Sequence, residues 1–66
     1  MSNLTQSEQD IFNVLFRAKG YAIHPDEITR ATDIKAVRVH IHRMRKKLPA
    51  NYKIKTVKGY RLVETV

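Results

Sequence analysis

The sequence contains no cysteine and no tryptophan, and it has only two glycines and two prolines among its 66 residues. Without cysteine the chain cannot form a disulfide framework or a thiolate metal site, which is consistent with a reducing compartment. No apolar run approaches the roughly 18 residues that a membrane-spanning helix needs. A chain of this length buries only about 60% of its unfolded surface, which is enough for one small core. We therefore expect a single domain over residues 1–66, with no room for a separate catalytic domain.

The charges are divided unevenly along the chain. Residues 1–34 carry three basic and five acidic side chains, whereas residues 35–66 carry ten basic side chains and a single acid, Glu64. The net charge is +7. A domain with one acidic and one basic half has a polarised field that steers it toward a polyanion. A surface that serves solubility alone would intersperse both signs.

The first half of the chain predicts two helices. Thr5-Gln6-Ser7-Glu8 is a capping box that opens a helix over residues 6–19, and Gly20 is suited to ending it. Pro25 suits the first position of a short second helix over residues 25–31, with His24 or a neighbour as its cap. The inward-facing residues of this second helix are expected to be Ile28 and Ala31.

A third and longer helix is predicted over residues 34–48. It follows a tight break in which Thr32 or Asp33 supplies the N-terminal cap, and Pro49 ends it. Its apolar residues recur at the three- and four-residue intervals of a helix face that packs on a core. This stripe consists of Ile34, Val37, Ile41, Met44 and Leu48.

The last part of the chain predicts a β-hairpin. Residues 52–57 are rich in β-forming side chains, Lys58-Gly59 is a two-residue turn, and residues 60–63 return as the second strand. An isolated hairpin is only marginally stable, so we expect it to pack against the helices. Ile54 and Leu62 should then face the core, while Lys53, Lys55 and Arg61 point outward. We expect Ile23 to enter the core or to make a brief β pairing. The predicted fold class is mainly α with a C-terminal β-hairpin.

Two helices joined by a short break, the second of them long and basic, form the helix-turn-helix arrangement in which the second helix enters the major groove of DNA. With its apolar stripe against the core, the 34–48 helix turns a mixed basic and apolar face outward. Cationic side chains on this face can donate to guanine O6 and N7, and Val39 can contact a thymine methyl. The expected base-reading residues are Lys35, Arg38, Val39, His42 and Arg43.

Phosphate contacts are expected from the end of that helix and from the hairpin. Arg45, Lys46 and Lys47 complement the helix dipole and suit phosphates better than bases. A basic hairpin beside a reading helix is a wing that follows the DNA backbone or reaches a minor groove. The same lysines also protect an exposed strand edge from aggregation. The basic wing residues expected at phosphates are Lys55, Lys58 and Arg61.

Three motifs carry a resemblance to a known family that extends over about residues 4–63. They are Leu4-Thr5-Gln6-Ser7-Glu8, Val37-Arg38-Val39-His40-Ile41-His42-Arg43-Met44-Arg45-Lys46-Lys47-Leu48 and Ile54-Lys55-Thr56-Val57-Lys58-Gly59-Tyr60-Arg61-Leu62. They resemble the C-terminal DNA-binding domain of OmpR/PhoB-type response regulators. The resemblance implies a winged helix-turn-helix with the 34–48 helix in the major groove and the hairpin as the wing. It also places His40 and Arg45 near phosphates, makes Arg43 a base reader, and brings Thr56 to the DNA backbone.

The chain departs from that family's pattern in three ways. Arg38 stands where the family usually has an acid, so base readout there is expected to differ. The family's N-terminal sheet and receiver domain are absent from this sequence, so no phosphorylation switch is inferred. The loop between the second and third helices and the wing turn are both short, which argues against polymerase recruitment. These departures favour a stand-alone small regulator or repressor.

Enzyme and metal chemistry receive little support. His40 and His42 are two positions apart on a helix, so they point to different sides, and no cysteine is present to complete a zinc site. The sequence has no Gly-rich phosphate loop and no nucleophile elbow. We therefore predict no metal, no cofactor and no enzymatic activity. The three tyrosines are expected to be half-buried in the core rather than stacked on bases.

The leading hypothesis is sequence-specific binding of double-stranded DNA in transcription control, by a cytoplasmic, nucleoid-associated protein that does not bind membranes. A homodimer on a repeated or palindromic site fits the limited affinity of one small reading head. The alternative is a protein-interaction module whose basic face meets an acidic partner, and which antagonises a transcription regulator or RNA polymerase. RNA or anionic-membrane binding is weaker, because the sequence lacks an RNA-recognition aromatic signature and its apolar helix stripe serves the core.

Overall fold

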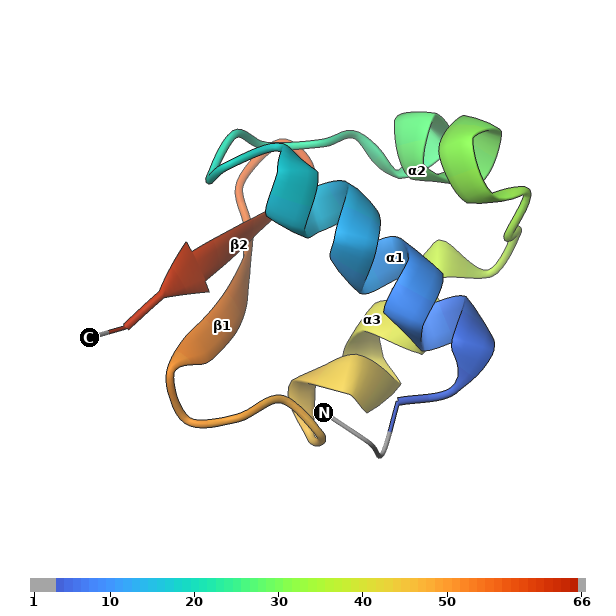
Figure 1. Cartoon of the computed structure of the whole chain (residues 1–66). Coiled ribbons are helices and arrows are strands. Elements are labelled where there is room, and N and C mark those ends of the chain that lie inside the picture. The colour runs from blue at the N-terminus through green and yellow to red at the C-terminus, as the bar shows by residue number, and fades with distance from the viewer. Residues whose placement is uncertain (1–3, 66) are drawn as a thin grey trace.

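Three helices followed by a two-stranded antiparallel hairpin make up the computed structural model, which describes residues 4–65. The helices are α1 (Gln6–Arg17), α2 (Pro25–Thr32) and α3 (Val37–Arg45), and the strands are β1 (Tyr52–Thr56) and β2 (Tyr60–Glu64). Helix α1 contacts α2, α3 and β2 (Figure 1), so it is the element around which the others pack. The predicted winged helix-turn-helix is confirmed. The remaining residues of the predicted domain, 1–3 and 66, lie outside the described part.

The capping box at the start of α1 is confirmed. Thr5 Oγ1 accepts the backbone N–H of Glu8 at 3.2 Å, and the backbone N–H of Thr5 donates to Glu8 Oε1 at 2.9 Å. The helix ends at Arg17, two residues before the predicted end. The left-handed residue that follows the C-cap is Lys19 (φ 51°) rather than Gly20 (φ 91°), which is also left-handed, so the helix ends before the position that the glycine alone predicts.

Helix α2 begins where the sequence predicts and runs one residue further. His24 is its cap, since its Nδ1 accepts the backbone N–H of Asp26 at 3.1 Å. Ile28 is fully buried, as expected, but Ala31 is exposed, so its predicted inward orientation is wrong. Ile28 is the only buried residue of this eight-residue helix. Its buried face is therefore narrow, and Ala31, three positions further along, lies outside that face.

The break after α2 works differently from the prediction. Asp33 adopts a left-handed conformation (φ 61°) and ends α2, with its N–H donating to the Thr29 carbonyl at 2.6 Å. Thr32 Oγ1 donates to the Ile28 carbonyl at 2.7 Å and accepts from the Ile34 N–H at 3.3 Å. Neither residue caps the next helix. The residue at the start of α3 is Ala36, which has no side-chain cap.

Helix α3 is shorter than the predicted 34–48. The chain bends at Lys35, and Ala36 has a non-helical backbone conformation, so the first regular turn begins at Val37. At the other end the helix tightens into a turn. There the backbone N–H groups of Lys46 and Lys47 donate to carbonyls only three residues back, and Pro49 then blocks continuation. Ile34 and Leu48 still pack against the core, but from the loops that flank the helix.

The hairpin pairs in a single register, with Ile54 opposite Leu62 and Lys55 opposite Arg61. The predicted two-residue turn is wrong: three residues, 57–59, connect the strands, so Val57 lies in the turn. Lys58 (φ 55°) and Gly59 (φ 139°) both take positive φ there. The predicted pairing of Ile23 is confirmed, because its N–H and carbonyl bond to the carbonyl and N–H of Tyr60 at 2.8 Å each.

The core lies between the helices and the inner face of the hairpin. Tyr60 is buried, and half-buried Tyr52 packs edge-on against Phe12 with ring centroids 5.6 Å apart. Tyr21 is 78% exposed, so the expectation that all three tyrosines are core residues fails for this one. None of the described helices is long and apolar enough to cross a membrane. The buried hydrophobic residues are Ile11, Phe12, Leu15, Ile28, Val37, Ile41, Met44, Ile54, Tyr60 and Leu62.

Candidate nucleic-acid interface

Helix α3 has one buried face and one exposed face. Val37, Ile41 and Met44 are each at most 3% exposed and anchor the helix to the core. Since successive residues turn by about 100°, the side chains between these anchors must point away from the protein. The exposed residues among them are Arg38, Val39, His42 and Arg43. These are four of the five residues predicted to read bases.

The fifth, Lys35, lies in the loop before α3 and is also exposed. It lines a groove of about 740 Å³ that runs between the starts of α2 and α3 and the wing. Arg38 and Val39 line the same groove from α3, and Thr56 and Lys58 line it from the wing. The fold therefore brings residues from both predicted sets, base-reading and phosphate-binding, to a single concave surface.

The C-terminal end of α3 is tied to the wing. The Arg45 guanidinium donates to Thr56 Oγ1 at 2.7 Å, and both side chains remain exposed. Lys46, the next residue, is exposed and has no partner among the described side chains. Two predicted phosphate ligands on α3 and the wing are thus held together, with their polar groups still accessible to solvent.

Lys47 is engaged elsewhere. Its Nζ lies 2.8 Å from Oε1 of Glu8, whose side chain is only 1% exposed. The hydrogen bond from Lys47, opposed by burial and reinforced by Thr5, lowers the pKa of the Glu8 carboxyl. Lys47 therefore neutralises a buried carboxylate at the start of α1, and we leave it out of the interface.

His40 is half-buried on the flank of α3. Its Nδ1 lies 2.8 Å from the carbonyl oxygen of Ala36, one turn back along the helix. A carbonyl can only accept, so this bond requires the proton on Nδ1 and leaves Nε2 as the ring atom available to another group. In the neutral ring Nε2 is an acceptor, and it becomes a donor to phosphate only when the imidazole is protonated.

The wing concentrates positive charge. Lys55, Thr56 and Lys58 are exposed, and Arg61 is half-buried on the same outer face of the hairpin as Lys55. Lys55 and Arg61 are direct cross-strand partners, and like charges in this position destabilise a hairpin. Arg61 Nε is also buried without a hydrogen-bond partner among the described residues. An anion beside this pair would relieve the repulsion.

Sequence reasoning missed the two side-chain bonds that organise this surface. Glu8 and Lys47 are 39 positions apart, and Arg45 and Thr56 are 11 apart. Periodicity assigns each residue to a face but does not say which faces meet. Within residues 4–65, no group of three or more histidine, aspartate or glutamate side chains is placed to hold a metal ion.

Comparison with known proteins agrees with the geometry. The family model described as "Transcriptional regulatory protein, C terminal" matches residues 1–62. Searches of curated proteins and of solved structures gave no match. The family is one of DNA-binding domains and is not a family of enzymes. The exposed basic face of α3, the adjoining wing and this match over nearly the whole chain lead to one conclusion: the chain belongs to the OmpR/PhoB-type family of DNA-binding domains of transcriptional regulatory proteins.

Proposed function

We propose that this domain binds a specific sequence of double-stranded DNA and acts as a small transcriptional regulator or repressor. Helix α3 lies in the major groove, and the wing lies on the backbone or in the adjacent minor groove. The observation that carries this proposal is the groove between α3 and the wing. It joins two cations, Lys35 and Arg38, and one apolar contact, Val39, which suit base edges, to Lys58 and the Thr56 hydroxyl on the wing, which suit phosphates.

The residues divide by the chemistry of their side chains. Arginine and lysine near the start of α3 reach guanine, and Val39, 47% exposed, offers an apolar contact to a thymine methyl. The base-reading set is Lys35, Arg38, Val39, His42 and Arg43. Side chains at the end of α3 and on the wing hold the backbone, which fixes the register of the helix on the duplex. The phosphate-binding set is His40, Arg45, Lys46, Lys55, Thr56, Lys58 and Arg61.

Selection from a random duplex pool tests the proposal. We expect the selected DNA to share one short site. Binding to that site should persist in excess competitor DNA, with log K falling steeply as log salt rises. Equal, weak binding to every sequence would contradict specific recognition. No shift of any duplex, together with stoichiometric capture of one regulator or polymerase subunit, would instead support the protein-interaction alternative.

A further inference from the structure

The outer edge of β2 is open beyond Tyr60. The N–H and carbonyl of Tyr60 point away from β1 and bond to Ile23, whereas the Thr65 N–H points the other way, to Asn51. Backbone groups along a strand alternate between its two sides, so those of Leu62 and Glu64 share the outward direction of Tyr60. Ile23 pairs only with Tyr60, and no other described segment continues along this edge.

The side chains on this edge do not prevent pairing. Natural sheets protect open edges with lysines, bulges or proline. Here the solvent-facing lysines, Lys53 and Lys55, are on β1. On the outer face of β2 the half-buried Val63 lies at the open part of the edge, and the half-buried Arg61 lies next to Tyr60, where Ile23 ends the open part. A β-branched apolar residue on the outer face of an unpaired strand is suited to contact with another strand.

We propose that this edge pairs with the same edge of a second copy of the chain, in an antiparallel, two-fold arrangement centred on Val63. In this register Leu62 of each copy lies opposite Glu64 of the other, and their N–H and carbonyl groups exchange four hydrogen bonds. The two Val63 side chains then meet across the axis as a non-hydrogen-bonded pair, with Cα atoms about 4.5 Å apart. The pairing stops where Ile23 already occupies Tyr60.

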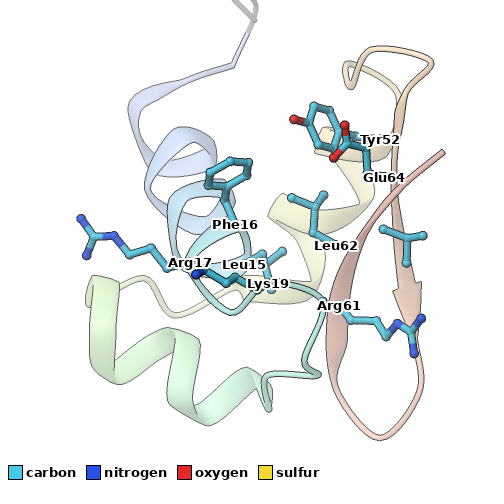
Figure 2. A pocket seen from close by; sticks show the side chains of 10 residues that line it. Leu15, Phe16, Arg17, Lys19, Tyr52, Arg61, Leu62 and Glu64 are labelled. Carbon is cyan, nitrogen blue, oxygen red and sulfur yellow. The ribbon is translucent and has the colours of Figure 1, made fainter. Parts of the chain in front are cut away.

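The charges beside the edge complement each other under the same symmetry. A hollow of about 640 Å³ lies between the end of α1 and β2. Figure 2 shows Glu64 at one end of it, near Tyr52, and Lys19 at the other, beyond Leu62. The antiparallel register carries Glu64 of the second copy toward Leu62, and therefore toward the cationic end of the hollow. The same contact occurs twice, once on each side of the axis.

Other features fit a modest interface. Phe16 is 55% exposed and lines the same hollow as residues 61–64, so it supplies apolar surface on the inner side of the edge. Four hydrogen bonds and a small apolar patch must also overcome the repulsion between two chains of charge +7. We therefore expect a weak dimer. The open part of the edge, residues 62–64, shares no residue with the groove between α3 and the wing, so a dimer leaves that groove uncovered.

Sedimentation equilibrium without DNA tests the inference at physiological ionic strength, over protein concentrations from micromolar to millimolar. For the natural chain we expect the apparent mass to rise toward that of a dimer. Val63→Lys sets two cations face to face on the axis and should hold the protein at the monomer mass. The matched control is Val57→Lys, which makes the same change at an exposed valine in the wing turn and should dimerise as the natural chain does.

Reversing the charges of Lys19 and Glu64 tests the register of the proposed pairing. Lys19→Glu and Glu64→Lys should each weaken self-association by at least several fold, because each sets like charges together twice. An equimolar mixture of the two variants should recover it, since both contacts then join opposite charges. A natural chain that stays monomeric throughout would overturn the proposal, as would a mixture no more associated than its components. If the proposed function also holds, the two-fold axis implies an inverted-repeat DNA site. The measurements above use no DNA, so they can refute the dimer without refuting DNA binding.

Discussion

The guanidinium of Arg45, in the last turn of α3, donates a 2.7 Å hydrogen bond to the hydroxyl of Thr56 at the end of β1. This bond joins the proposed reading helix to the proposed wing at a point where both are exposed. The wing has few other ties to α3, because its inner side packs mainly through β2 on α1. We therefore expect the bond to restrain the angle between the two parts of the proposed DNA-binding surface in the free protein.

Removing the acceptor should loosen the wing. In Thr56→Val the shape of the side chain is nearly kept but the hydroxyl is lost, so residues 56–60 should show lower backbone order parameters by NMR relaxation of the free protein. Thr56→Ser keeps the hydroxyl and is the matched control. Because the contact is exposed, we expect little change in the unfolding midpoint. Unchanged order parameters in the valine variant would mean that the bond does not restrain the wing.

Substitutions on α3 and on the wing should have different effects on DNA binding. Arg43→Ala removes a fork of donors that suits guanine O6 and N7, so it should lower affinity for the selected site by about 1–3 kcal/mol and relax preference at one position. Lys55→Ala removes a phosphate contact, so it should weaken all sequences alike and reduce the salt slope by about 1. Both are measured by titrating the selected and a scrambled duplex at several salt concentrations. The same loss of discrimination in both variants would contradict the division of roles.

The two glycines should differ in their tolerance of a side chain. A Cβ at Gly59 (φ 139°) would lie 2.8 Å from the Ile23 carbonyl oxygen, and would push apart the bridge between the wing and the segment before α2. A Cβ at Gly20 (φ 91°) meets nothing within 4 Å, so only the backbone conformation opposes it. We expect Gly20→Ala to cost about 1 kcal/mol and Gly59→Ala about 2–3 kcal/mol in urea unfolding. Equal costs would show that the Ile23 bridge yields readily.

Local chemistry made much of this fold predictable. The capping box at Thr5, the proline at the start of α2 and the apolar spacing of α3 each act within a few residues, so the pattern along the chain contains what is needed. The wrong predictions concern residues whose positions depend on contacts with distant parts of the chain. Ile34 continues the apolar spacing of the third helix, but it packs against the core from the loop before that helix.

The residues expected at the interface also include several whose positions the sequence pattern predicts and one, Lys47, whose position it does not. Exposure of Arg38, His42 and Arg43 follows from burying the opposite face of one helix, and periodicity is sufficient for that. The position of Lys47 is different, because a lysine at the end of a basic helix has the same sequence signature whether it meets solvent, phosphate or a buried acid. Only the packing of α1 beside the end of α3 places Glu8 within its reach.

That ion pair makes stability depend on pH in a definite direction. The Glu8 pKa is lowered in the folded protein, first of all by the hydrogen bond from Lys47. The folded state therefore binds this proton less readily than the unfolded state. The stabilisation is complete above the ordinary pKa of glutamate and is lost as the pH falls through that value toward the lowered one. Urea unfolding across the acid range should show this loss, and Glu8→Gln should flatten it.

At neutral pH, Glu8→Gln should also destabilise the domain by about 2–3 kcal/mol. This is less than the 3–5 kcal/mol typical of a fully buried pair, because the Lys47 side chain is 32% exposed and recovers some hydration when its partner is lost. Lys47→Met keeps the apolar stem and leaves the buried carboxylate unpaired, so it should cost at least as much. A double-mutant cycle tests whether the ion pair is the cause. If it is, the double variant should lose less free energy of unfolding than the sum of the two single losses. Additive losses would mean that the two side chains stabilise the fold through separate contacts.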